Sequence, residues 1–394
     1  MGTSGLEVAH IVDRFGPAYR EDHRLPERHL RALWAIENCR TATLGGHLSQ
    51  CDGCDYEQVR YNSCRNRHCP KCQSLDKERW LEKRSQELLP VPYFHLVFTL
   101  PAELNALVLR NQQVLYDLLF ATASQTLLEI AADPKHLGAQ IGVLAVLHTW
   151  NQQLTEHPHL HCIVPGGGLS PDRRRWVSSR PDFFLPVRVL SRLFRGKFLH
   201  RLRALYAAGE LAFPGQIAEL AQRQSFDDLI AQLFCKEWVV YSKPPFSGPE
   251  HALRYLARYV HRVAISNDRL VRLEGDQVTF SYRDRAHGDR YREMTVSGEE
   301  FLRRFLLHIL PDHFVRIRSY GLLASRNRET NLALCRELLG AERPPARPPQ
   351  ATWSELLQRL TGVDPLLCPQ CRQGHLRTIG EVAPQRGVAA RAPP

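Results

Sequence analysis

The chain has 394 residues, of which 43% are hydrophobic and 24% are charged, a balance typical of a globular protein of about two or three domains. No apolar run approaches the roughly 20 residues needed to span a bilayer, and the first residues lack a secretory pattern, so we expect a cytoplasmic protein. The 52 Lys and Arg residues outnumber the 41 Asp and Glu residues. The resulting net charge of +11 favours a polyanionic partner, although charge alone does not identify one.

Hydrophobic periodicity and turn residues divide the chain into helices and strands. In chain order, we expect helical structure up to about residue 35, a charged helix over 74–89, a strand over 93–101, one or two helices over 103–133, strands over 141–150 and 159–165, helices over 188–208, 215–234 and 251–263, strands over 270–275 and 278–284, and a helix over 297–310. The strands before and after each short turn are expected to pair as hairpins.

A proline-rich segment separates a short tail from the rest of the chain. Residues 341–350 contain four prolines in ten residues, which predicts a semi-rigid linker. We therefore divide the chain into an N-terminal part (1–90) with a helical lead and a cysteine-rich block, a central part (91–340), and the linker with its tail (341–394).

Six of the eleven cysteines lie between residues 39 and 72, which points to metal binding, because a chain without an export signal does not predict a disulfide framework. Fourteen residues separate two Cys-x-x-Cys pairs, Cys51 with Cys54 and Cys69 with Cys72. The two-residue gap lets both thiolates of a pair reach one ion, so the two pairs predict a structural zinc site. Buried cysteines without a metal fit poorly, because the segment is short and polar.

Four further candidate zinc ligands remain in this block: Cys39, His47, Cys64 and His68. They form either a second tetrahedral zinc site or, in the case of Cys64 and His68, part of a loop. The basic residues nearby include Arg65, Arg67 and Lys71. A zinc module with basic loops often binds nucleic acid, although zinc modules also bind proteins.

A row of histidines runs into the predicted strand over 159–165. His157, His159 and His161 occupy alternate positions, and alternate residues of a strand face the same side. Exposed surface histidines would explain a single pair, but the third histidine and the three glycines at 166–168 favour a site that a ligand approaches closely. Two or three imidazoles with open coordination positions indicate a catalytic metal that acts on phosphate.

The predicted helix over 251–263 combines an apolar face with a basic one. Arg254, Arg258 and Arg262 form a stripe opposite the apolar face, and Tyr255 and Tyr259 lie between the two. Tyrosines taken alone are most simply explained as residues at the edge of the core. A phenol beside guanidinium groups is also placed to attack a phosphodiester, because arginine neutralises the phosphate.

In combination, these motifs resemble the HUH endonucleases, and most closely the two-tyrosine rolling-circle transposases of bacterial insertion sequences. The segments that carry the resemblance are YNSCRNRHCPKCQ, FHLVFTLP, HPHLHCIVPGGG, YLARY and RSYGLLASRNR, in that order, within residues 25–335. The resemblance implies an α+β fold with an antiparallel sheet, flanking helices and the histidine strand at the centre. It also implies a small N-terminal zinc-binding domain for DNA recognition and a catalytic domain over 91–340.

The resemblance implies a mechanism as well. His159 and His161 would hold Mg²⁺ or Mn²⁺ with a third ligand, and Tyr255 or Tyr259 would attack single-stranded DNA, leaving a 5′-phosphotyrosine and a free 3′-OH. The second tyrosine would allow a second strand transfer, and the order of attack is open. The candidates for the third ligand are His157, which has the right face, and His95, His148 and His261.

The tail contains half of a zinc motif. Cys368 and Cys371 form a Cys-x-x-Cys pair with His375 nearby, and Cys335 is a candidate partner from across the linker. The alternatives to a further structural zinc are an evolutionary remnant and a contact between subunits.

Two other functions are open at this point: an HUH nicking enzyme of plasmid or phage replication, and a zinc-finger protein that binds DNA without cleaving it. The zinc block and the YLARY segment fit the nicking enzyme less well. A binding protein has no use for both the histidine face and the tyrosine helix. The oligomeric state and the DNA sequences recognised are not encoded in any motif of the chain.

Overall fold

The structure is a computed structural model that describes residues 5–243, 248, 251, 255, 263–284, 287–342 and 351–385. Its helices are α1 (Val8–Asp22), α2 (Glu27–Glu37), α3 (Gln73–Ser85), α4 (Asn105–Arg110), α5 (Gln112–Ala132), α6 (Val187–Ala207), α7 (Arg223–Cys235), α9 (Gly298–Leu307), α10 (Arg328–Leu338) and α11 (Trp353–Thr361). Its strands are β1 (Gly46–Cys51), β2 (Glu57–Tyr61), β3 (Tyr93–Thr99), β4 (Gly142–Trp150), β5 (Glu156–Pro165), β6 (Gly167–Leu169), β7 (Trp176–Ser178), β8 (Val240–Lys243), β9 (Leu270–Glu274), β10 (Gln277–Asp284), β11 (Arg290–Ser297), β12 (Ile317–Gly321) and β13 (Leu376–Val382).

Most of the predicted elements are confirmed, including the α+β class and both hairpins, β4 with β5 and β9 with β10. The helical lead divides into α1 and α2, because Pro26 caps the second helix in an extended conformation. The helix expected over 215–234 begins only at Arg223, since residues 215–221 form a 3₁₀ helix. The helix expected over 251–263 lies largely outside the described residues.

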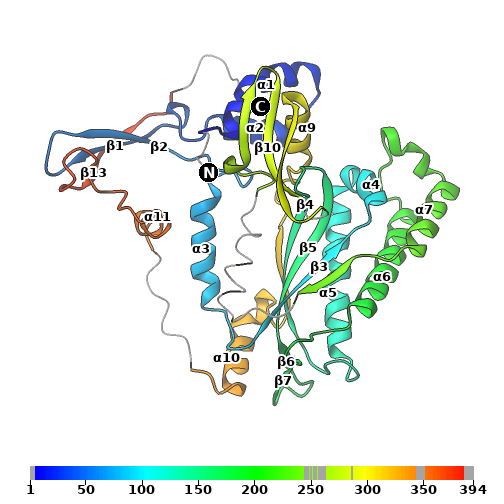
Figure 1. The fold of residues 1–394 in the computed structure, drawn as a ribbon. Helices are drawn as coiled ribbons and strands as arrows, with labels where there is room; N and C mark the ends of the chain where they lie inside the picture. The colour runs from blue at the N-terminus through cyan, green and yellow to red at the C-terminus, as the bar shows by residue number, and fades with distance from the viewer. Residues whose placement is uncertain are drawn as a thin grey trace.

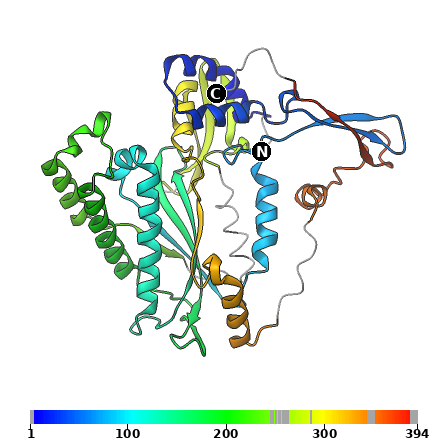
Figure 2. The same ribbon diagram turned by 180° about the vertical axis from the view of Figure 1, so that it is seen from behind.

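The main sheet has five antiparallel strands in the order β12-β4-β5-β3-β8, with the histidine strand β5 at its centre as expected. Apolar side chains of one face, such as Phe98, Leu147 and Leu160, are buried against α4–α7. Figures 1 and 2 show α5 and α6 covering this face along most of its length. Because alternate residues point to opposite faces, the remaining side chains of β3, β4 and β5 lie on the other face.

That second face is only partly apolar. Leu144, Val146 and Ile163 pack with side chains of α10 and with Trp80 of α3. Figure 2 shows α3 and α10 on the side of the sheet opposite α5. Beyond this apolar patch, the same face carries the histidines of β4 and β5 in place of core residues.

A separate core joins the N-terminal helices to the second hairpin. Ile11 of α1 and Leu33 of α2 are buried with Phe280 of β10 and Phe301 of α9. Cys39, Cys69 and Cys72 belong to the same core, which therefore joins the N-terminal segment to residues 264–309 of the central part. The expected domain boundaries at 90 and 340 remain predictions.

The three-stranded sheet β13-β1-β2 projects from the body as an arm (Figure 1). Its central strand β1 pairs antiparallel with β2 and with β13, so that Gly46 lies opposite Val382 and Cys51 opposite Leu376. The tail of the chain is therefore a structural part of the N-terminal cysteine-rich block.

Helix α5 is long and apolar enough to cross a membrane by length and composition, and it is the one such helix in the described part of the chain. Its apolar character has a simpler origin, because Leu115, Leu119 and Phe120 are fully buried in the main core.

Gly321 at the end of β12 provides a test of the main sheet. Its φ is +59°, and a Cβ would lie 2.0 Å from the carbonyl oxygen of Ile141. Gly209, after α6, is a matched control, because its φ is +69° but a Cβ there would meet no atom within 4 Å. We expect Gly209→Ala to cost about 1 kcal/mol through backbone strain and Gly321→Ala about 3 kcal/mol, because the backbone must also shift.

Urea unfolding followed by circular dichroism measures both differences. Equal losses for the two variants would show that the contact between β12 and the Ile141 backbone does not constrain the sheet.

Candidate active site and cysteine clusters

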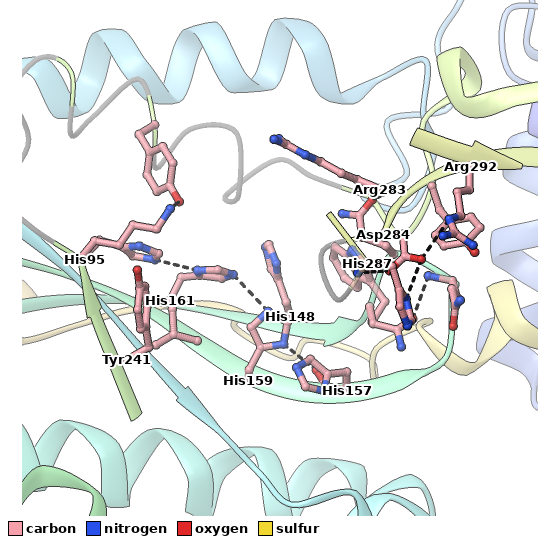
Figure 3. A pocket seen from close by; sticks show the side chains of 18 residues that line it. His95, His148, His157, His159, His161, Tyr241, Arg283, Asp284, His287 and Arg292 are labelled. Carbon is pink, nitrogen blue, oxygen red and sulfur yellow. Dashed lines mark hydrogen bonds and ion pairs between the residues drawn. The ribbon is translucent and has the colours of Figure 1, made fainter. Parts of the chain in front are cut away.

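A cavity of about 720 Å³ lies over the histidine face of the main sheet (Figure 3). Strands β3, β4 and β5 supply five of its histidines, and His287 between β10 and β11 supplies a sixth. Tyr241 and Lys243 of β8 line one side, and Asp284 and Arg292 of the β10–β11 hairpin line the other. Asp284 pairs with Arg292 at 3.2 Å, so the hairpin side presents an ordered charged rim to the cavity.

Three histidines on neighbouring strands form a compact cluster. His148 of β4 lies directly opposite His159 of β5, and His161 follows two residues later on the same face. One ring nitrogen of each lies within 4.8 Å of the other two, and the Nε2 atoms of His159 and His161 are 3.1 Å apart. All three are buried. Three converging imidazole nitrogens can hold a metal ion.

Of the candidates for the third ligand among the described residues, His148 is the one that groups with His159 and His161. A bulge places both His157 and Pro158 opposite the single residue Thr149, because Trp150 pairs with Glu156 while His148 pairs with His159. Proline favours such a bulge because it has no N–H for the ladder. The extra residue breaks the strict alternation, so His148 completes the cluster and His157 lies beside it.

Hydrogen bonds orient the two histidines of β5. His159 Nδ1 lies 2.6 Å from the carbonyl oxygen of His157, which can only accept, so Nδ1 carries the proton and Nε2 keeps its lone pair. His161 Nδ1 lies 2.8 Å from His95 Nε2. When Nδ1 of His161 donates to His95, the Nε2 lone pairs of His159 and His161 face each other, as metal ligands require.

His95 of β3 is suited to accept that hydrogen bond. It is buried, and burial together with the nearby Lys243 charge lowers the pKa of His95 to about 3. The imidazole is therefore neutral at physiological pH, with one nitrogen available as an acceptor. His95 was a candidate for the third ligand, but the geometry makes it a residue that orients His161.

A tyrosine hydroxyl lies at the edge of this cluster. Lys243 Nζ donates a hydrogen bond to Tyr255 Oη at 3.1 Å. The Tyr255 ring meets the His95 ring edge-on, with centroids 5.2 Å apart. One imidazole thus separates the phenol from His161. Five other candidates from the same part of the sequence lie outside the described residues: Tyr259, His261, Arg254, Arg258 and Arg262.

No sequence motif indicates that Lys243 and Tyr241 line the site. Lys243 reaches the site because β8 pairs with β3, which places it opposite His95. β8 is an edge strand of only four residues after a long helical region. A short edge strand lacks the periodicity that would show which of its side chains face the histidines.

The cysteines form two four-residue clusters, and the structure corrects their expected grouping. The first cluster consists of Cys39, Cys64, Cys69 and Cys72. The second consists of Cys51, Cys54, Cys368 and Cys371. Each Cys-x-x-Cys pair stays together as expected, but Cys51 and Cys54 share a cluster with the tail, because β1 pairs with β13.

The sulfur–sulfur distances in both clusters fit a zinc ion with tetrahedral coordination. Cys72 Sγ lies 3.6 Å from the sulfurs of Cys39 and Cys64. Four sulfurs at about 2.3 Å from a zinc ion would be about 3.8 Å from one another. A disulfide would require about 2.05 Å, and every cysteine of the chain is free.

The remaining candidate zinc ligands lie outside these clusters. His47 is exposed on β1, and His375 pairs with Asp364 at 3.4 Å. His68 is half-buried, and desolvation holds its pKa well below the usual value. Cys335 lies on α10 and is buried in the apolar core against the second face of the sheet.

Two of the three basic residues proposed to contact DNA from the cysteine block are turned inward. Arg67 donates to the carbonyl oxygens of Phe314 and Pro311, at 2.5 and 2.8 Å. Lys71 pairs with Glu7. Arg65 is exposed and lines a second cavity, of about 1320 Å³, between the arm and α3.

Comparison with known protein families gives two matches. One covers the first cysteine cluster and the other covers the histidine site. A family described as "Transposase zinc-binding domain", of the IS91 type, matches residues 11–100, which include the whole first cysteine cluster. A family described as "Putative transposase" matches residues 142–330, which include the three histidines and Tyr255. No solved structure matches the chain.

Two relatives match along almost the whole chain. "Putative transposase y4qJ" of Sinorhizobium fredii is 52% identical over 382 residues, which are 96% of this chain and 96% of the relative. "Transposase for insertion sequence element IS801" of Pseudomonas savastanoi pv. phaseolicola is 28% identical over 379 residues, 92% of this chain and 84% of that protein. The chain therefore belongs to the insertion-sequence transposases that carry an IS91-type zinc-binding domain.

Proposed function

We propose that the chain cleaves and rejoins single-stranded DNA through a 5′-phosphotyrosine formed on Tyr255 or Tyr259, with a divalent cation at His148, His159 and His161. The observation that carries the proposal is the position of the Tyr255 hydroxyl. It lies at the edge of a buried three-histidine cluster, held by Lys243 and one imidazole away from His161. Membership in a transposase family supports DNA as the substrate.

The donor set fits a divalent cation. Three imidazole nitrogens converge, and the Nδ1 contacts of His159 and His161 direct the Nε2 atoms of both rings toward each other, 3.1 Å apart. Imidazole favours Mn²⁺ over Mg²⁺, because Mg²⁺ prefers oxygen ligands. When bound, the cation would neutralise charge on the phosphate and make phosphorus more electrophilic.

The chain's own groups account for the transfer. The Tyr255 oxygen forms a bond to phosphorus as the bond to the 3′ oxygen breaks. The phenolic proton leaves to solvent, and the 3′ oxygen takes one up. Lys243 holds the phenol oxygen and stabilises negative charge that develops on it. Reversal by a 3′-OH of another strand rejoins the DNA without an external energy source, and Tyr259 would provide a second covalent site.

The first cysteine cluster has a structural role in this proposal. Cys39, Cys69 and Cys72 are buried in the core that α1, α2 and α9 form with the second hairpin. A zinc ion there would hold the cysteine block against the catalytic part of the chain.

The tyrosine assignment predicts a covalent adduct. With Mn²⁺ and labelled single-stranded DNA from the ends of its own element, the wild-type chain should give a labelled band that survives denaturing electrophoresis. The variant Tyr255→Phe/Tyr259→Phe should lose the band completely, because no phenol remains at the site. Tyr291→Phe is the control, because Tyr291 is 72% exposed on β11 and lies outside the cavity lining.

A band that persists in the double variant but disappears in Tyr241→Phe would assign the attack to the edge strand β8 and contradict the proposal. Nicking without any covalent band would indicate a hydrolytic nuclease.

The third-ligand assignment predicts different effects for two histidines. His148→Ala should raise the Mn²⁺ concentration for half-maximal adduct formation by roughly tenfold or more, since a ligand is lost. His157→Ala should have a smaller effect, because the hydrogen bond that orients His159 goes to the His157 backbone and survives the substitution, although the ring contact is lost. The exposed His200 of α6 provides the control variant His200→Ala. A larger shift for His157→Ala than for His148→Ala would refute the assignment.

The Lys243 contact predicts a rate effect separate from metal binding. At saturating Mn²⁺, Lys243→Ala should slow adduct formation about tenfold or more, because the developing charge loses a donor. The Mn²⁺ half-saturation should stay unchanged, and Lys243→Arg should restore most of the rate. Lys197→Ala on α6 is the control. A change in half-saturation with an unchanged rate would mean that Lys243 serves the metal site.

A further inference from the structure

We infer that Cys51, Cys54, Cys368 and Cys371 bind one zinc ion, and that this ion docks the C-terminal tail onto the N-terminal arm. The two pairs are more than three hundred positions apart in the sequence. The matched zinc-binding region ends at residue 100, so it contains only half of these ligands. The site therefore makes the zinc-binding part of the protein discontinuous.

The sulfur geometry is that of a four-cysteine zinc site. Cys51 Sγ lies 3.7 Å from Cys371 Sγ, and Cys54 Sγ lies 3.7 Å from Cys368 Sγ. These distances agree with the value of about 3.8 Å for a tetrahedral zinc–thiolate site and exclude a disulfide.

Each pair also lies in a turn that directs backbone N–H groups at sulfur. The N–H of Gly53 donates to Cys51 Sγ, and the N–H of Gly374 donates to Cys371 Sγ, both at 3.3 Å. Such bonds stabilise thiolates, the form of cysteine that binds metal. The two turns are in direct contact, since a Cβ on Gly374 would lie 2.6 Å from Cys51 Sγ.

The protein contacts around the site are polar, local and partly exposed. Asp52 accepts a hydrogen bond from the His375 N–H at 2.7 Å and pairs with Arg377 at 3.1 Å. Among the described residues, the associated cluster consists of the buried Cys51, Cys368 and Leu376, with Cys54, Tyr56 and Cys371 partly buried against them. So small an apolar core cannot stabilise a three-stranded arm by itself, and a metal ion would supply the missing free energy.

Further contacts hold the tail where the site is formed. Arg60 of β2 donates to the carbonyl oxygen of Pro365 and lies 5.5 Å from the centre of the Trp353 ring. Arg359 of α11 pairs with Glu82 of α3 at 2.5 Å. They are one part-buried hydrogen bond, one cation–π contact and one exposed ion pair, and the exposed ion pair contributes little by itself.

The zinc content of the full-length chain tests the inference by elemental analysis. With both cysteine clusters loaded, the wild type should contain about two zinc ions per chain. Cys51→Ser/Cys54→Ser and Cys368→Ser/Cys371→Ser should each lose one ion. The four-serine variant should lose no more than either pair, because both pairs hold the same ion. The exposed Cys235 provides the control variant Cys235→Ser, which should keep the wild-type content.

Loss of a second ion in the four-serine variant would show that the pairs bind separate ions, and wild-type zinc content in Cys368→Ser/Cys371→Ser would show that the tail binds none. Either result overturns the inference. Neither depends on DNA cleavage, so the inference and the proposed function can fail independently.

If the serine variants do not fold, thiol alkylation of the wild type gives the answer. Peptide mass spectrometry should show all four cysteines protected in the native chain and alkylated together, at one rate, when a chelator is added. Immediate alkylation of Cys368 and Cys371 before chelation would contradict the inference.

Discussion

The antiparallel pairing of β4 with β5 is the constraint on which the rest of the catalytic region depends. Strand alternation sends one set of side chains, including Leu147 and Leu160, into the main core. The alternate set on the same two strands includes His148, His159 and His161. The burial that stabilises the sheet on one face therefore fixes three imidazoles on the other, without any loop having to be ordered.

This arrangement buries the histidines as well as fixing them. His95, His148, His159 and His161 are all at most 9% exposed. For His95, burial and the nearby Lys243 charge lower the pKa to about 3, so this imidazole stays neutral and can accept the hydrogen bond from His161. The charged groups of the cavity, Lys243 on β8 and the Asp284–Arg292 pair on the hairpin, lie at its two sides. A DNA backbone bound between these groups would contact charged side chains at the rim of the cavity and imidazole nitrogens at its floor.

Local patterns in the sequence predicted most of the helices and strands. The site residues that they did not predict depend on pairings between distant strands. Alternation predicted that His159 and His161 share a face, but His157 lies in a bulge that Pro158 favours without fixing its position in the sequence. Placing His148 beside His159 and His161 required the register between β4 and β5, which the sequence does not show. In the same way, Cys-x-x-Cys spacing identified each cysteine pair, whereas the partner of Cys51 and Cys54 depended on the pairing of β1 with β13. Spacing constrains neighbours in the chain, and it carries no information about which distant strand will lie alongside.

The pairing of β1 with β13 also has consequences for folding during translation and for truncated copies of the gene. β1 is the first strand that the ribosome produces and β13 is the last in the described chain, so the arm remains unfinished until translation is nearly complete. Until then β1 has an open edge, which is a site for pairing with other chains. A genomic copy shortened after α10 loses the edge strand and two of the four sulfurs of the second cluster. Damage at the end of the gene would thus appear in the protein as a defect near its beginning.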